Sequence, residues 1–323
     1  MESIIQNLYK RISEENHKVD FDEAMKLYSV ADSNELFESA NNLRKKFCPS
    51  TTSVCSIINA KQGRCSENCK YCAQSAWWKT DCPSSDVIDA KLALEKTKYA
   101  AANKISRLSL VTAGKGISGP DFEKVLECFK TITEGCPQVK LCASLGIISY
   151  EQMLRLKEVG IVRYHHNIEC CESYYPNICT SHSYGDRIKT LQAAKKAELE
   201  LCCGGIIGLG EGRAERVKLA LALREIGPQS IPINILSPIK GTPLENAKEL
   251  SKDEILRTIA VFRFIMPAST LRTAAGRKKL GRNGIDSFKS GANALISGDF
   301  LTIEGSSNDE DLQMLEELGF QPE

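Results

Sequence analysis

Short runs rich in β-branched residues alternate with longer amphipathic segments from Val54 to near the end of the chain. This alternation is typical of repeated strand and helix units, whose strands form a parallel sheet. The eight runs lie at Ser53–Ala60, Ile105–Thr112, Val139–Leu145, Ile161–Ile168, Leu199–Ile207, Ser230–Leu236, Thr270–Ala274 and Ala292–Ile296. Eight such units predict an α/β fold of the (β/α)8 TIM-type barrel class.

Helix boundaries between the runs support this prediction. Ser149–Gln152 and Ser251–Glu254 have the pattern of a capping box, in which the first and fourth residues satisfy each other's backbone N–H groups. Gly160 and Gly227 are placed to end helices ahead of the next strand. These signals predict helices in the intervals between the strands.

The two ends of the chain differ from the repeats. Residues 1–50 contain few β-branched runs, and Asp20 is a good N-cap, so they predict an N-terminal helical extension. Residues 51–323 are predicted to form the barrel as a single domain, with a final helix at Asp309–Leu318 that ends at Gly319. The sequence has no linker long enough to separate domains.

The charge balance and the N-terminal residues bear on partners and location. The 323 residues carry 42 lysines and arginines against 41 acids, so no electrostatic footprint favours nucleic acid. The N-terminal segment is acidic and polar where a signal peptide is basic and then apolar, and no apolar run approaches membrane length. We therefore expect a cytoplasmic protein that binds neither nucleic acid nor membranes.

Three cysteines follow the first predicted strand with the spacing CxxxCxxC, at Cys65, Cys69 and Cys72. A four-iron cluster has one ligand position on each iron, so three thiolates leave one iron open for a substrate or cofactor. Zinc is an alternative, but a structural zinc site takes four ligands, and no cysteine or histidine follows Cys72 at finger-like spacing. A disulfide is less favoured in a cytoplasmic chain, and ordinary buried thiols are the third interpretation.

Other polar or reactive residues occur in the predicted strands or directly after them. In a barrel of this class the active site lies at the C-terminal ends of the strands, which is where the CxxxCxxC segment falls. Taken singly, each of these residues is more simply a structural residue of the core. Their recurrence at one end of the barrel predicts a site made of Cys142, Asn167, Glu169, Cys202, Asn234 and Arg272.

The cysteine motif, with Tyr71 beside its last cysteine, resembles that of the radical S-adenosylmethionine enzymes, in which the methionyl amine and carboxylate bind the open iron. Further segments narrow the resemblance to the biotin synthase family, and it extends from about Cys55 to Phe320. These segments are Cys69–Ser75, Tyr164–Glu169, Gly204–Glu211, Ile231–Asn234, Gly241–Leu244 and Arg272–Arg277.

The resemblance implies an activity, its cofactors and its partners. A 4Fe-4S cluster on the three motif cysteines would reduce S-adenosylmethionine, and the resulting radical would abstract hydrogen from dethiobiotin. Sulfur would then close the ring of biotin, which makes the chain a radical sulfurtransferase. The family also implies an electron donor such as flavodoxin or ferredoxin, and a homodimer.

The resemblance also assigns roles near S-adenosylmethionine. Arg187 would pair with the methionyl carboxylate, for which its guanidinium is suited, and Glu169 and Tyr71 would contact the cofactor. Gly205 and Ile207 would allow the backbone to approach the nucleoside. The alternative for this glycine-rich segment is a strand-to-helix turn without a ligand.

Two asparagines are assigned to the substrate. Asn167 and Asn234 match the amides that bind the ureido group of dethiobiotin, and a neutral group with both donor and acceptor atoms suits that role.

The chain departs from the family pattern at the second cluster. The better-known members hold a two-iron cluster with three cysteines and an arginine. Cys142, Cys202 and Arg272 match three of those positions, but Ser109 stands at the fourth, and serine is a poor substitute for a thiolate. The usual two-iron site is therefore in doubt.

Additional cysteines suggest a relocated site. Because neighbouring strand residues face opposite sides, Cys202 and Cys203 cannot both face the barrel interior, and the resemblance selects Cys202. We predict an auxiliary iron–sulfur cluster on Cys142, Cys179 and Cys202, with Arg272 as a further ligand or neighbour. Four irons with an additional sulfide are favoured over two, as in a branch of the family associated with anaerobes. The alternative is that Cys179 is a buried spectator.

Two other functions stay open at this point. One is a related radical enzyme that acts on another small molecule in the same kind of barrel. The other is a metal-binding or redox-sensing protein without catalysis, for which the 14 cysteines would be the binding groups. No role is predicted for seven of them, Cys48, Cys82, Cys128, Cys136, Cys170, Cys171 and Cys203.

Overall fold

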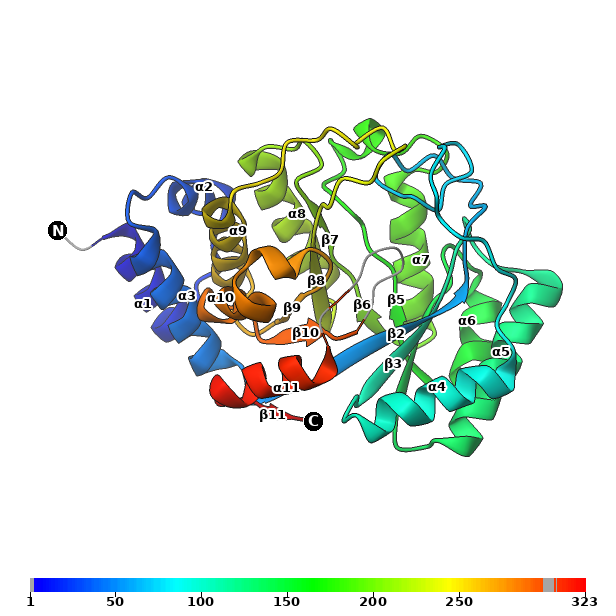
Figure 1. Cartoon of the computed structure of the whole chain (residues 1–323). Helices are drawn as coiled ribbons and strands as arrows, with labels where there is room; N and C mark the ends of the chain where they lie inside the picture. The colour runs from blue at the N-terminus through cyan, green and yellow to red at the C-terminus, as the bar shows by residue number, and fades with distance from the viewer. Residues whose placement is uncertain (1–2, 299–304, 306) are drawn as a thin grey trace.

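The eight predicted strand runs form one closed parallel barrel in the computed structural model, which describes residues 3–298, 305 and 307–323 (Figure 1). Neighbouring strands pair in parallel around the sheet, and the pairing of Cys202 with Ser230 closes it. The strands in chain order are β2 (Val54–Lys61), β3 (Arg107–Thr112), β4 (Lys140–Ser144), β5 (Ile161–His165), β6 (Glu200–Cys202), β7 (Gly205–Ile207), β8 (Ser230–Ile235), β9 (Thr270–Thr273) and β10 (Ala294–Ile296). The predicted (β/α)8 class is confirmed.

The fifth predicted run is not one continuous strand. It divides into β6 and β7 around Cys203 and Gly204, where the chain passes very close to β8. A Cβ at Gly204 would lie only 1.9 Å from the Pro232 carbonyl oxygen, so this approach requires glycine. Gly204 therefore lies at a break in the strand, although the β-branched residues nearby predicted a continuous strand.

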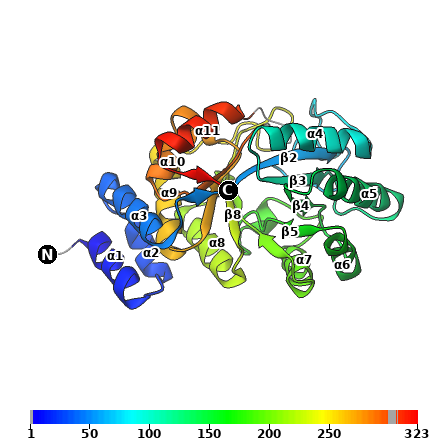
Figure 2. The ribbon, with the colours of Figure 1, turned by 90° about the horizontal axis from the view of Figure 1, so that it is seen from below.

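Helices fill the intervals between the strands and surround the barrel (Figure 2). Their inner faces pack on the outer side of the strands and form one large apolar core with it, whereas alternate strand residues face the interior of the barrel. The helices are α4 (Ala90–Ala102), α5 (Gly119–Gly135), α6 (Tyr150–Glu158), α7 (Tyr184–Lys196), α8 (Arg213–Ile226), α9 (Lys252–Ile265) and α10 (Ile285–Lys289).

One of the two predicted capping boxes forms completely. At the start of α6 the Gln152 N–H donates to the Ser149 hydroxyl, and the Ser149 N–H donates to the Gln152 side chain. At the start of α9 the Ser251 hydroxyl accepts from the Glu254 N–H, but the Glu254 carboxylate instead binds Arg213 and Arg216. The predicted bond from the Ser251 N–H to the Glu254 carboxylate is therefore wrong, because two arginines of α8 bind that carboxylate instead.

The predicted N-terminal extension consists of α1 (Ile4–Glu15), α2 (Phe21–Tyr28) and α3 (Ser33–Phe47), which lie beside α8 and α9 (Figure 1). Asp20 caps α2 in a capping box with Glu23, as expected from its sequence. Three arginines of the barrel helices donate to backbone carbonyls of this segment. These pairs are Arg213 with Tyr28, Arg224 with Val19 and Arg257 with Val30.

The predicted C-terminal helix is α11 (Asn308–Glu317), which ends one residue before the predicted Leu318. After it, β11 (Gln321–Pro322) pairs in parallel with β1 (Thr51–Thr52), just ahead of the first barrel strand. A buried ion pair between Asp311 and Arg277 joins α11 to the segment after β9. Within the described residues, no helix is both long and apolar enough to cross a membrane.

Arg263 on α9 offers a stability test, because its side chain is fully buried. The guanidinium donates to the carbonyl oxygens of Gly291, Pro267 and Ser269 at 2.8 to 2.9 Å and to the Asn293 side chain at 2.9 Å. We expect Arg263→Met to lower the free energy of unfolding by about 3 kcal/mol or more, because it leaves buried oxygens without donors. Urea denaturation measures this loss.

The control is Arg282→Met, because Arg282 is exposed and its ion pair among the described residues is with the half-exposed Glu317. An exposed ion pair contributes little, so this variant should unfold near the midpoint of the unchanged chain. Equal losses in the two variants would contradict the role given to the buried hydrogen bonds.

Candidate active site

A cavity lies inside the barrel and opens at the C-terminal ends of its strands, where the loop after β2 contributes to its wall. Aliphatic side chains make up much of the lining, and the remaining positions carry reactive, charged or amide groups. These groups are Cys55, Tyr71, Cys72, Arg107, Ser109, Cys142, Arg163, His165, Asn167, Glu169, Cys202, Asn234 and Arg272.

The CxxxCxxC loop is held in place by its own backbone. The Cys65 N–H donates to the Gln74 carbonyl at 2.9 Å, and the Cys72 N–H donates to the Cys69 carbonyl at 3.0 Å. Cys72 and Tyr71 face the cavity. Burial raises the pKa of Cys72 to about 11, so this thiol stays protonated at neutral pH until a metal binds.

The spacing of the motif sulfurs fits a cluster better than a single ion. Among the described residues, the ligand atoms that lie within 4.8 Å of one another are those of Cys69, Cys179 and His182, and no such group combines the motif cysteines. A single zinc ion needs its ligands in one tight group, whereas a cluster holds each thiolate on a separate iron. Cys65, Cys69 and Cys72 therefore suit a 4Fe-4S cluster.

A second group of thiols lies on the strands themselves. Cys142 on β4 and Cys202 on β6 both face the cavity, as predicted, and Cys55 on β2 faces it as well. Burial raises the pKa of Cys202, but His165, whose Nδ1 is 3.2 Å from its sulfur, and the nearby arginines outweigh this effect and lower it to about 7. Burial raises the pKa of Cys142 to about 12, and Cys55 adds to the rise.

Positive charge and two unpaired polar atoms surround these thiols. Arg107 lies with a guanidinium nitrogen 3.9 Å from the Cys142 sulfur, and Arg163 and Arg272 also line the cavity. The Ser109 hydroxyl and Arg107 Nε are buried and have no hydrogen-bond partner within the described structure. An anionic cluster with thiolate ligands would supply acceptors for both, so the donor set fits an auxiliary iron–sulfur cluster.

The structure does not bring Cys179 into this cavity. Cys179 follows the short helix at Tyr175–Asn177 and lies beside the motif loop, where its sulfur is 3.7 Å from that of Cys69. It is absent from the residues that line the cavity with Cys142 and Cys202. The structure therefore places Cys142 and Cys202 together but separates Cys179 from them. The reason is that the β5–α7 loop, which carries Cys179, folds onto the motif loop.

Arg272 and Arg187 are both committed to protein partners. Arg272 donates to Ser53 and Ser230 and to the Leu295 carbonyl, so it lines the cavity as a fixed positive charge rather than as a free ligand. Arg187 donates to the Tyr175 hydroxyl at 2.6 Å and to the Asn167 carbonyl at 2.9 Å. These bonds fit a residue that positions the end of β5.

The residues after β5 present polar groups to the cavity. Glu169 has a left-handed backbone (φ 66°), and its carboxylate lies 3.6 Å from Arg187 and 3.4 Å from the Asn167 amide nitrogen. Asn167 and Asn234, which are predicted to bind the substrate, both line the cavity. The Asn234 amide donates to the Gly205 carbonyl at 3.2 Å, which fixes its orientation.

The glycine-rich segment contributes one side chain to the cavity wall. Ile206, rather than Ile207, lines the cavity, whereas Ile207 faces the apolar core. A Cβ at Gly205 would lie 2.5 Å from the Glu169 carbonyl oxygen, so this glycine is required by packing between β7 and the end of β5. Gly205 and Ile207 both lie within β7, and their approach to the nucleoside stays a prediction.

Four ionisable residues of the cavity wall were not predicted, namely Cys55, Arg107, Arg163 and His165. Alternation along the strands could have found three of them. Arg107 lies two residues before Ser109, and two residues on a strand share a face. Arg163 and His165 share the face of β5 in the same way.

Comparisons with known proteins identify the fold and the family. Residues 60–223 match the model of the Radical SAM superfamily, and residues 232–321 match that of the Biotin and Thiamin Synthesis associated domain. The fold is similar to that of a methylornithine synthase, with a TM-score of 0.81 at 18% identity over 98% of this chain and 97% of that one. An FeFe-hydrogenase maturase from Carboxydothermus hydrogenoformans gives 0.79 at 16% identity over 98% and 79%.

Fold, motif and cavity together define a radical S-adenosylmethionine enzyme, whose cofactors are a 4Fe-4S cluster and S-adenosylmethionine. The chain is 46% identical to the biotin synthase of Clostridium tetani over 99% of its own length and 98% of that protein. It is 47% identical to the biotin synthase of Acetivibrio thermocellus over 95% and 96%. The chain belongs to the biotin synthase family.

Proposed function

We propose that the chain converts dethiobiotin to biotin inside the barrel cavity. The observation that carries the proposal is that two separate thiol sets open on the same space, Cys72 of the motif loop at its mouth and Cys142 and Cys202 on its strands. When bound, the motif cluster and S-adenosylmethionine supply a radical able to remove hydrogen from unactivated carbon, which no side-chain acid or base can do. The chain positions the substrate between the two sets.

The cavity wall is suited to a substrate that combines a hydrocarbon portion with a polar ureido ring. Aliphatic side chains such as Ile57, Val111 and Ile296 line it and keep water from the reacting carbons. Asn167 and Asn234 offer amide donors and acceptors for the ureido group. Tyr71 and Glu169 are the groups proposed to contact S-adenosylmethionine, since both face the same mouth of the cavity.

Removing the Asn234 amide should weaken substrate binding. We expect Asn234→Ala to raise the KM for dethiobiotin by about 10-fold to 100-fold, because it leaves polar atoms of the ureido group without partners. Steady-state kinetics of biotin formation measures the change. Asn103→Ala, at the exposed end of α4, is the control and should leave the KM unaltered; an unaltered KM in Asn234→Ala would remove this residue from the substrate site.

The auxiliary cluster that would supply sulfur is proposed to bind Cys55, Cys142 and Cys202. The support is that these thiols face one cavity with Arg107, Arg163 and Arg272, whose charge offsets that of thiolate and sulfide. A four-iron cluster with an additional sulfide is proposed, because Ser109 stands where the two-iron pattern needs a thiol. Cys55 on the neighbouring strand β2 compensates for that loss.

The test is to incubate the reconstituted chain anaerobically with reductant, S-adenosylmethionine and dethiobiotin. Biotin formed together with 5'-deoxyadenosine supports the proposal. Deoxyadenosine that dethiobiotin does not stimulate, without biotin, would favour a radical enzyme with another substrate. Neither product from a chain loaded with iron would favour a protein that only binds metal.

The electron donor and the assembly belong to the same proposal. We propose a small redox protein such as flavodoxin or ferredoxin as the donor, a cytoplasmic location and a homodimer, all of which follow from membership of the family. Measuring the mass of the loaded chain in solution tests the last point.

A further inference from the structure

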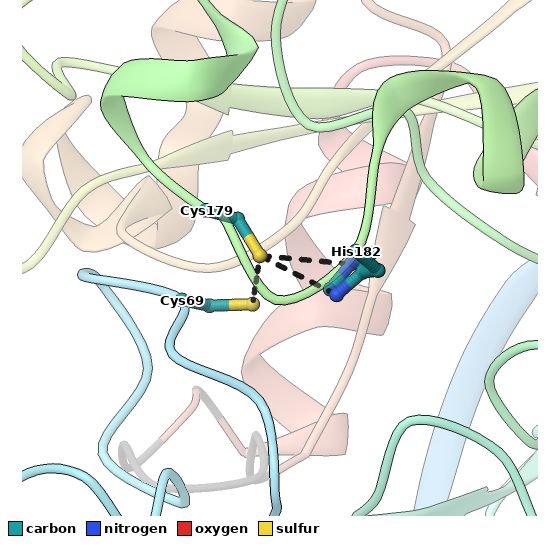
Figure 3. A group of neighbouring side chains, drawn as sticks. All are labelled: Cys69, Cys179 and His182. Atoms are coloured by element: carbon teal, nitrogen blue, oxygen red, sulfur yellow. Dashed lines mark hydrogen bonds between the residues drawn. The ribbon is translucent and has the colours of Figure 1, made fainter.

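A compact group of metal-ligating side chains lies outside the cavity, where the motif loop meets the segment between β5 and α7. Figure 3 shows that Cys69, Cys179 and His182 point toward one another. All three side chains are buried, with exposed fractions of 7%, 3% and 8%. Their ligand atoms all lie within 4.8 Å of one another, which makes them the one group of this kind among the described residues.

The distances match a single tetrahedral ion. With metal–sulfur bonds of about 2.3 Å, a tetrahedral zinc ion holds two thiolate sulfurs about 3.8 Å apart and a sulfur and a nitrogen about 3.5 Å apart. The sulfurs of Cys69 and Cys179 are 3.7 Å apart. The Cys179 sulfur lies 3.9 Å from Nε2 of His182, about 0.4 Å beyond the second value.

The histidine has the carboxylate partner that metal-bound histidines usually have. Glu67 lies inside the CxxxCxxC loop, and its Oε2 is 2.6 Å from Nδ1 of His182. A carboxylate on one ring nitrogen orients the ring and leaves the other nitrogen, here Nε2, for a metal. Glu67 is itself held by the Ser181 hydroxyl at 2.8 Å.

The two loops that carry the ligands are fixed to each other without any metal. The Asn68 side chain accepts from the N–H groups of Thr180 and Ser181 at 2.9 and 3.1 Å, and the Asn68 N–H donates to the Ser181 hydroxyl at 3.0 Å. The Lys70 N–H donates to the Ile178 carbonyl at 2.9 Å. The ligands are therefore already gathered, so binding requires little rearrangement.

We propose that Cys69, Cys179 and His182 form a binding site for one divalent ion of the zinc class, Zn²⁺ or Fe²⁺, in the chain that lacks its motif cluster. Two thiolates and an imidazole are the ligands that such ions prefer. The fourth position is open to water. A disulfide between the two cysteines accounts less well for the group, because it would give no role to His182 and Glu67.

Because Cys69 is shared, the ion and the motif cluster exclude each other. The metal site itself stands without the proposed function, and only this competition rests on it. The site of Cys69, Cys179 and His182 would bind a single metal ion beside the motif loop before the 4Fe-4S cluster is assembled.

The test uses the full-length chain, freed of metal under reducing, anaerobic conditions and titrated with Co²⁺, which reports thiolate ligation by its charge-transfer absorption. We expect one tight site, weakened at least tenfold in both Cys179→Ala and His182→Gln. Glu67→Gln keeps all three ligands and should still weaken binding by about 10-fold to 100-fold. Zn²⁺ should displace the cobalt.

Two further variants keep the result specific. Cys72→Ala should retain the cobalt site, since Cys72 is a motif cysteine that lies outside the group. Cys171→Ala, a buried cysteine of the same segment, should also retain it and controls for loss of fold. Equal affinity in the unchanged chain and in Cys179→Ala and His182→Gln, or loss of the site in Cys72→Ala alone, would overturn the proposal.

Discussion

Cys72→Ala is expected to reduce both biotin formation and cleavage of S-adenosylmethionine to background in the anaerobically reconstituted chain. Cys72 is the motif cysteine that faces the cavity, and no other sulfur of the described cavity wall belongs to the motif loop. The reaction depends on chemistry that only the cofactor supplies, so loss of one cluster ligand removes all of it. Quantifying 5'-deoxyadenosine and biotin after each incubation measures both effects.

The matched control for that variant is Cys82→Ala. Cys82 follows the motif in sequence, is only partly buried and hydrogen-bonds locally to the Pro83 carbonyl. Its replacement should leave both products at the level of the unchanged chain. If Cys72→Ala still cleaved S-adenosylmethionine, the assignment of the motif cluster would be wrong.

Cys202→Ala is expected to separate the two products, with deoxyadenosine still formed and biotin lost. Cys202 lies in the cavity beside Cys142 and His165 and away from the motif loop, so its loss should remove the auxiliary cluster alone. Iron per chain should fall from about eight to about four if both clusters hold four irons. Iron analysis and product quantification on one sample give both values.

Cys203→Ala is the control for the second variant, because the adjacent residue faces the apolar core instead of the cavity. It should keep both iron and biotin. Cys55→Ala should behave as Cys202→Ala does, whereas Cys179→Ala should keep the auxiliary iron. The opposite pattern for these last two cysteines would restore the grouping that the sequence predicted.

The barrel could be predicted from the sequence because each of its units repeats one local pattern, a β-branched run followed by an amphipathic helix. The break between β6 and β7 could not be predicted in this way. It arises where Gly204 meets the Pro232 carbonyl of β8, a contact between residues far apart in sequence. The half-formed capping box at Ser251 has a similar cause, since two arginines of another helix take its glutamate.

The site residues also differ in whether a local sequence pattern or a contact between distant segments determines their position. The motif cysteines could be predicted from their local spacing. For Cys202, strand alternation showed that only one of Cys202 and Cys203 faces the interior, and the resemblance selected Cys202. The position of Cys179 depends on how the loop after β5 folds onto the motif, and no local pattern encodes that contact.

The most direct test of the account is to follow the sulfur atom. The auxiliary site is rebuilt with iron and isotopically labelled sulfide, free sulfide is removed, and a single turnover with dethiobiotin is analysed by mass spectrometry. The account predicts labelled biotin from the unchanged chain and none from Cys202→Ala. Unlabelled biotin, or labelled biotin at an undiminished yield from Cys202→Ala, would contradict it.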